Sequence, residues 1–270
     1  MMIITANNVN YFVEVMGEGP PVLFLHGFTG DSTTWEAITS KLQQNFKCIS
    51  VDIIGHGKSD APVDSKRYAI EKVAEDLKCI LHELEVHSAS ILGYSMGGRL
   101  ALTFAILFSS YIDKLILESS TPGLRTEVER IERRAKDKTL SDMIVKEGLS
   151  SFVEYWESIP LFSSQKRLPL SVQKSIRNQR LNQSPEGLSA SLAGMGTGEQ
   201  PSWWEEFKQL DIPIHVLVGE EDTKFVSIAN EMKKVNDKVE ISTFPHVGHA
   251  IHVEEPRKFG TMVEEILKNS

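Results

Sequence analysis

One serine lies between glycines in a setting that favours chemistry. The segment Gly93-Tyr94-Ser95-Met96-Gly97 follows an apolar run typical of a strand and precedes a run typical of a helix. A sharp strand-to-helix turn of this kind presents a serine hydroxyl above a sheet, and the small residues beside it relieve steric strain. The pattern predicts that Ser95 is a reactive hydroxyl.

A serine hydroxyl needs a base at neutral pH, usually a histidine that a carboxylate orients. In the chain order serine, acid, histidine, Asp222 follows a late strand-like run and His249 follows the final one. We predict that these two residues complete a triad with Ser95, because Gly248 allows a tight loop that projects His249. The alternatives are His246 and His252 for the base, and Glu220 and Glu221 for the acid.

A second glycine-bearing turn, LHGFTG, follows the first long apolar run. Such a turn can aim the backbone N–H of Phe28 at the same point as the N–H of Met96. Two converging donors of this kind form an oxyanion hole, which stabilises negative charge on a reacting oxygen. We interpret the neighbouring His26 as structural.

Arg99 occupies the first turn of the predicted helix after Ser95, where the helix dipole disfavours a cation. Helical side chains lean toward the N-terminus, so the guanidinium can reach back toward Ser95. We therefore expect Arg99 to meet an anion there, although a surface ion pair is the ordinary alternative.

The elements that must position these residues alternate between short apolar runs and longer helical patterns, which predicts an α/β fold with a mostly parallel sheet. Strand-like runs occur near Ile3 and at 11–15, 21–25, 47–52, 89–94, 114–119, 214–219 and 239–244. Apolar residues recur at helical spacing over 68–84, and Pro256 opens a final helix.

The alternation stops between residues 122 and 205, a stretch too long for a loop. We predict a helical cap at 122–205 over a core formed by 1–121 and 206–270, at the carboxyl edge of the sheet where such folds place ligands. The cap holds 12 Lys and Arg against 11 Asp and Glu, whereas the rest holds 17 against 26. Seven of the ten arginines lie in it.

The composition excludes several classes of partner. A net charge of −8 gives no reason to expect binding to nucleic acid or anionic membranes. Neither a secretory signal nor an apolar run of membrane-spanning length is visible, so we expect a cytoplasmic protein. Cys48 and Cys79 lack metal-ligand spacing, and we expect both to be buried free thiols.

Together these motifs resemble the α/β-hydrolase fold superfamily. Within it the chain resembles the 2-succinyl-6-hydroxy-2,4-cyclohexadiene-1-carboxylate synthases of menaquinone biosynthesis. The segments that carry this resemblance are GYSMGGRLAL, ESSTPGL, W-x-x-x-P-L-F, GLSASLAGMGTGEQPSWW and DTKF, together with an arginine pair before Asp137. Ser95 argues against dehalogenases of this fold, which carry an aspartate at that position.

The resemblance implies a lyase that removes pyruvate from an enolpyruvyl cyclohexene carboxylate, without a metal or organic cofactor. It implies a small substrate with several carboxylates, and it leaves the oligomeric state open. The substrate-binding residues carried over are Arg99, Arg133, Arg177, Tyr94 and Trp156, with Arg134 and Arg180 as alternatives for the two cap arginines.

Two other functions fit the same motifs. A carboxylic-ester or thioester hydrolase would use Ser95 as a nucleophile and form an acyl-enzyme. A non-catalytic ligand-binding protein of hydrolase-like fold is the second alternative, and the complete set of triad residues disfavours it.

Overall fold

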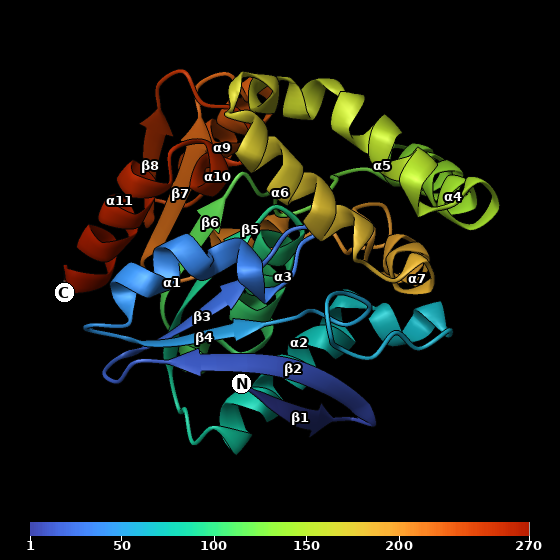
Figure 1. Ribbon diagram of the computed structural model, residues 1–270. Helices are drawn as coiled ribbons and strands as arrows, with labels where there is room; N and C mark the ends of the chain where they lie inside the picture. Colours follow the sequence, from blue (N-terminus) through green and yellow to red (C-terminus); the bar gives the residue numbers. More distant parts are fainter. Residues whose placement is uncertain (270) are drawn as a thin grey trace.

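A single eight-stranded sheet runs through the computed structural model, which describes residues 1–269 (Figure 1). The strand order is β1-β2-β4-β3-β5-β6-β7-β8. The two pairings that involve β2 are antiparallel, and all the others are parallel. The strands are β1 (Met2–Ala6), β2 (Val9–Met16), β3 (Pro21–Leu25), β4 (Lys47–Val51), β5 (Ala89–Tyr94), β6 (Ile112–Glu118), β7 (Ile214–Gly219) and β8 (Val239–Phe244).

The central strands are buried on both faces, which explains why their sequences are apolar without alternation. Every residue of β5 is buried, as are four of the five residues of β3. The pairing register places Leu25 of β3 beside Gly93 of β5, and Gly93 beside Leu117 of β6. The carboxyl ends of these strands therefore meet at one edge, and the α/β prediction is confirmed.

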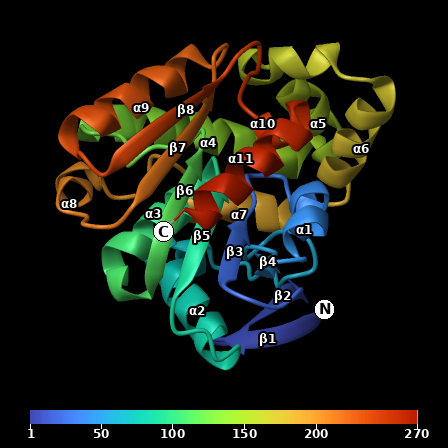
Figure 2. The same ribbon diagram turned by 90° about the vertical axis from the view of Figure 1, so that its left-hand side faces the viewer.

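Helices cover both faces of the sheet (Figures 1 and 2). On one face lie α1 (Glu36–Leu42) and α11 (Pro256–Lys268), which pack against each other. On the other lie α2 (Ile70–Glu83), α3 (Met96–Leu107) and α9 (Thr223–Val235). Each layer buries its own apolar cluster against the sheet, so the sheet is the centre of the core.

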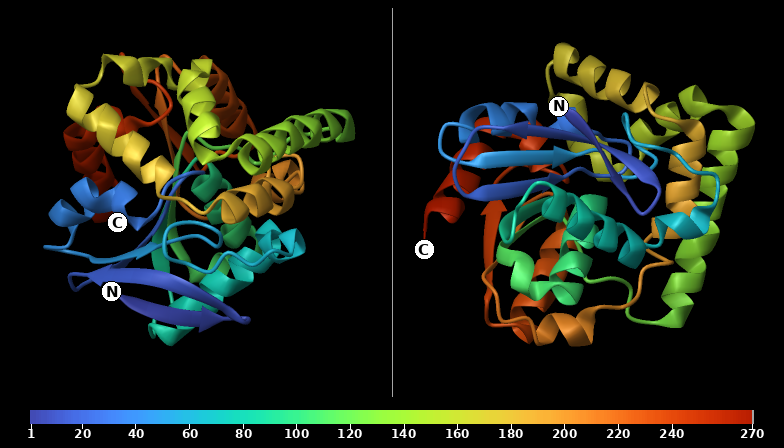
Figure 3. Two further views of the ribbon diagram at one scale, coloured as in Figure 1. Left: turned by 45° about the vertical axis from the view of Figure 1, so that its right-hand side comes forward. Right: turned by 90° about the horizontal axis from the view of Figure 1, so that it is seen from below.

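Between β6 and β7 the chain forms helices and no strand. All of these helices but the last gather on one side of the sheet, toward which the arrowheads of β3 and β4 point (Figures 1 and 3). They share a small apolar cluster around Phe152 and Leu188. The helices are α4 (Glu127–Glu147), α5 (Leu149–Ser158), α6 (Leu170–Leu181), α7 (Pro185–Met195) and α8 (Trp204–Lys208). Their status as a separate cap remains a prediction.

Short helices complete the chain: α10 (Ile251–Glu254), η1 (Ser32–Trp35), η2 (Ser65–Tyr68), η3 (Ser109–Tyr111) and η4 (Pro160–Arg167). Within residues 1–269 no helix combines the length and apolarity needed to span a membrane. In the same residues, no three side chains of His, Cys, Asp or Glu gather as a metal ion would require.

The cysteine prediction is correct for one residue and wrong for the other. Both thiols are free, and Cys48 in β4 is buried. Cys79 is exposed, because it lies on α2 away from the apolar stripe that faces the sheet. Burial raises the pKa of the Cys48 thiol to about 12, so this side chain acts as a small apolar core residue.

Candidate active site

Ser95 occupies a strained turn between β5 and α3. Its backbone has φ 50° and ψ −105°, a conformation that non-glycine residues rarely adopt. The backbone N–H of Ser95 donates to the carbonyl of Glu118 at 2.9 Å, which fixes the turn to the end of β6. A Cβ atom on Gly97 would collide with the backbone oxygen of Leu25, so the turn needs a glycine there. The sequence pattern therefore predicts the local geometry correctly.

The structure brings Ser95, His249 and Asp222 together from three loops at the carboxyl edge of the sheet. His249 Nε2 lies 3.1 Å from Ser95 Oγ, and His249 Nδ1 lies 2.6 Å from Asp222 Oδ2. His249 and Asp222 are both buried, and His249 is only 2% exposed. A carboxylate at Nδ1 favours a proton on that nitrogen, which leaves Nε2 free to accept the serine proton.

The alternative bases and acids have other partners. His246 is exposed, and its backbone N–H donates to Glu220 at 3.0 Å. Glu221 forms an ion pair with Arg167 at 2.8 Å. None of these groups contacts Ser95 in the structure, so the geometry favours Asp222 and His249.

His252, the remaining alternative base, belongs to a second buried pair beneath the first. Its Nδ1 atom lies 2.8 Å from Glu118 Oε2, and its ring lies edge-on to the ring of Tyr94 with 4.6 Å between centroids. Because the Glu118 carbonyl also holds the N–H of Ser95, this pair supports the turn from below. His252 therefore contacts Glu118 and Tyr94, and not the hydroxyl of Ser95.

The hydroxyl of Ser95 faces a cavity that most of the predicted substrate-binding residues border. Its lining includes Tyr94, Arg99, Arg133, Trp156 and His249. Among the described residues that line it, there is no aspartate or glutamate. The cavity is therefore suited to an anionic ligand.

Phe28 and Met96 also border this cavity, as the predicted oxyanion hole requires. Met96 is the first residue of α3, where backbone N–H groups have no partner within the helix. The N–H of Phe28 donates to no acceptor among residues 1–269. His26 instead joins two loops, since its Nε2 accepts the N–H of Ile53 at 2.9 Å. That contact agrees with its interpretation as a structural residue.

Arg99 is buried at the floor of the cavity, and neutral groups hold it there. Its guanidinium donates to Gln200 Oε1 at 2.8 Å and to the Met195 carbonyl at 2.9 Å. Burial and the nearby charge of Arg133 lower the pKa of Arg99, while Asp137 opposes this. The segment around Met195 and Gln200 therefore positions the guanidinium of Arg99. This guanidinium forms no ion pair with a carboxylate of residues 1–269.

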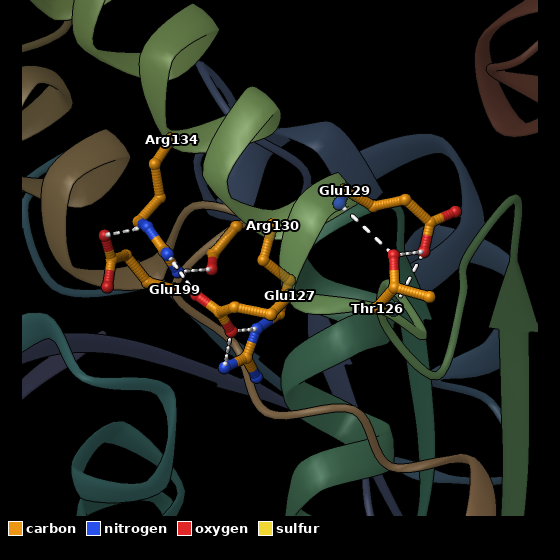
Figure 4. Close-up of polar contacts among 7 residues, drawn as sticks. Thr126, Glu127, Glu129, Arg130, Arg134 and Glu199 are labelled. Atoms are coloured by element: carbon orange, nitrogen blue, oxygen red, sulfur yellow. Dashed lines mark hydrogen bonds and ion pairs between the residues drawn. The ribbon is translucent and has the colours of Figure 1, made fainter.

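The two adjacent arginines of α4 differ in their surroundings. Arg133 borders the cavity and donates to Asp137 at 2.8 Å. Arg134 points elsewhere, toward Glu127 and the carbonyl of Gly198, and Figure 4 shows it beside Glu127 and Glu199. Of the two alternatives, Arg133 is the one at the cavity.

Arg177 does not reach the cavity that contains Ser95. It borders a neighbouring cavity between α5, η4 and α6, and it pairs with Glu157 at 2.5 Å. Arg180, the alternative, is buried and lies over the ring of Phe162 at 4.8 Å. Phe162 borders both cavities. Arg180 therefore lies nearer than Arg177 to the cavity that contains Ser95.

Sequence reasoning gave no individual role to several polar residues of the cavity, among them Ser119 and Lys224. Ser119 borders the cavity with φ 47°, and its buried hydroxyl has no hydrogen-bond partner among residues 1–269. Lys224 also borders it, two residues after Asp222. The signal that could have singled out Lys224 is the one used for Arg99, a cation in the first turn of a helix that begins at the site.

Comparisons with known proteins show the family and the fold of the chain. A family model described as alpha/beta hydrolase fold matches residues 20–256. A Bacillus subtilis protein, provisionally named a 2-succinyl-6-hydroxy-2,4-cyclohexadiene-1-carboxylate synthase, is 44% identical over 98% of this chain and 97% of its own.

Two solved structures extend the comparison. MenH from S. aureus superimposes with a TM-score of 0.91 at 37% identity, covering 96% of this chain and 97% of that one. An esterase from Thermogutta terrifontis gives a TM-score of 0.86 at 26% identity, covering 99% and 97%. The chain belongs to the alpha/beta hydrolase fold family and, within it, to the family of 2-succinyl-6-hydroxy-2,4-cyclohexadiene-1-carboxylate synthases.

Proposed function

We propose that this protein is a lyase of menaquinone biosynthesis. It eliminates pyruvate from 2-succinyl-5-enolpyruvyl-6-hydroxy-3-cyclohexene-1-carboxylate and yields 2-succinyl-6-hydroxy-2,4-cyclohexadiene-1-carboxylate. The observation that carries the proposal is a Ser95–His249–Asp222 chain that opens on a cavity bordered by three cations and, among the described residues, by no carboxylate. Family membership supports the same reaction.

In the proposed mechanism Ser95 acts as a base. His249, oriented by Asp222, takes the serine proton, and the serine oxygen removes the ring proton next to the succinyl carbonyl. The electrons of that C–H bond form a new ring double bond, the existing double bond shifts, and the C–O bond to the enolpyruvyl group breaks. Pyruvate leaves as its enolate and is then protonated at carbon. The substrate is neither oxidised nor reduced.

Two sets of groups would stabilise the charges in this reaction. The N–H groups of Phe28 and Met96 would bind the oxygen of the succinyl carbonyl, where negative charge develops as the proton leaves. Arg99 and Arg133 would bind carboxylates, for which the planar guanidinium is well suited. Tyr94 and Trp156 would form the apolar walls beside the ring.

The test is a measurement of pyruvate release from the enolpyruvyl substrate, coupled to lactate dehydrogenase. We expect Ser95→Ala, His249→Ala and Asp222→Asn each to lower kcat by about 10³-fold or more, because each removes part of the proton relay. His246→Ala is the matched control, since this histidine lies in the same loop but is exposed. Release of pyruvate by Ser95→Ala at the wild-type rate would refute the proposed role of the serine.

A carboxylic-ester hydrolase remains the second candidate, and the likeness to the esterase is the observation that favours it. It would use Ser95 as a nucleophile and form an acyl-enzyme. The cation-lined cavity is a poor match for neutral esters. Rapid turnover of neutral esters and labelling of Ser95 by a phosphonate, without pyruvate release, would establish the hydrolase instead.

A further inference from the structure

Two helices begin at the edge of the Ser95 cavity, and each carries a cation in its first turn. Arg99 is the fourth residue of α3, and Lys224 is the second residue of α9. The positive end of a helix dipole disfavours a cation at both positions. Neither cation stabilises the helix that carries it. We therefore expect each cation to bind an anion.

Lys224 has no such partner among the described residues 1–269. Its ammonium group forms no ion pair and donates no hydrogen bond to any of residues 1–269, although it lies 5.3 Å from the centre of the Phe225 ring. In α4, two of the three lysines, Lys138 and Lys146, pair with Asp142. Lys224 thus borders the cavity with its charge uncompensated by direct contact.

The charge of Arg133 acts on the other two cations of the cavity. Desolvation and the charge of Arg133 lower the pKa of Lys224, and the same two causes lower the pKa of Arg99. Asp222 and Asp137 oppose these shifts, but Asp222 is bound to His249 and Asp137 to Arg133. An anion in the cavity would relieve this repulsion.

We infer that Lys224 is a substrate-binding residue, which holds one carboxylate of a tricarboxylate ligand while Arg99 and Arg133 hold the others. This inference rests on the proposed function, whose substrate carries three carboxylates, on the ring, the succinyl chain and the enolpyruvyl group. The match in number between cations and carboxylates gives the cavity its specificity for this charge pattern.

A kinetic experiment tests the inference on the intact protein. In the pyruvate-release assay, Lys224→Ala should raise KM about tenfold, as expected for the loss of one exposed charge-assisted hydrogen bond, and change kcat much less. Lys224→Arg should restore most of the affinity, because it keeps the charge. Lys234→Ala is the matched control, since Lys234 is exposed on the same helix away from the cavity.

A binding experiment separates this inference from the proposed function. Calorimetry would measure the affinity of benzene-1,3,5-tricarboxylate for the wild type and for Lys224→Ala at low and high salt. Weaker binding by the variant and a smaller salt dependence support the role of Lys224, even if the wild type releases no pyruvate and the proposed function fails.

The opposite result is equally distinct. If the wild type releases pyruvate and Lys224→Ala has an unchanged KM and an unchanged affinity for the tricarboxylate, the proposed function stands. Lys224 would then be a solvated surface residue, and the inference would be overturned.

Discussion

Arginines of the helices between β6 and β7 differ in what neutralises them. Arg133 contacts Asp137 and borders the Ser95 cavity, which no carboxylate of residues 1–269 lines. Arg177 pairs with Glu157 in the neighbouring cavity. Arg133 uses its Nε atom for Asp137, so its terminal nitrogens are available to a carboxylate in the cavity, whereas Arg177 uses a terminal nitrogen for Glu157 and borders a different cavity.

These positions predict unequal effects of two similar substitutions. We expect Arg133→Ala to raise KM for the enolpyruvyl substrate about tenfold or more, because a bound carboxylate loses a charged donor. Arg177→Ala should change KM by about twofold or less, since its side chain lies outside that cavity. Steady-state pyruvate release by both variants checks this. An equal or larger effect of Arg177→Ala would show that Arg177 of α6 binds a substrate carboxylate.

The turn between β5 and α3 shows how closely elements must approach to build the site. Gly97 packs against the backbone at the end of β3, which is also where the Phe28 loop begins. This contact sets the distance between the two predicted oxyanion donors. Gly260 in α11 is different, because a Cβ there would lie 3.5 Å from Ile38 Cδ1, an ordinary contact distance.

A pair of glycine substitutions tests this packing. Gly97→Ala should lower the free energy of unfolding by about 1–3 kcal/mol or more, because the methyl group meets backbone that cannot move aside. Gly260→Ala should raise it by about 0.5–1 kcal/mol through helix propensity. Urea denaturation measures both values. A neutral Gly97→Ala would show that β3 and α3 are less tightly packed than the structure indicates.

At the scale of the whole molecule, several titratable groups are buried away from the cavity. His56 is 1% exposed and contacts His26 and Phe28 with its ring. Burial, together with the neighbouring His26, lowers the pKa of His56 to about 3. Burial also lowers the pKa of His26. Both rings therefore remain neutral in the folded protein where the unfolded chain would protonate them.

This difference makes stability depend on pH. Because the unfolded state binds the extra proton, the free energy of unfolding should fall as pH drops below about 6.5. For His56 alone the loss between pH 7 and pH 5 is about 2 kcal/mol. Urea denaturation at both values should show a smaller pH dependence in His56→Asn, and His26 and His215, whose pKa values burial also lowers, would contribute to the remainder. An unchanged dependence in the variant would contradict the role of His56.

The sequence by itself determined the strand-forming segments and the chain order of Ser95, Asp222 and His249. Local spacing suffices for these, because strand ends in a parallel sheet meet at one edge whatever the loops contain. Only the tertiary structure decided which cations face the cavity. Arg133 and Arg134 are adjacent in one helix, and what each meets depends on segments distant in the chain, such as Gly198 for Arg134. The same packing placed Lys224 at the cavity that contains Ser95 and left Arg177 outside it.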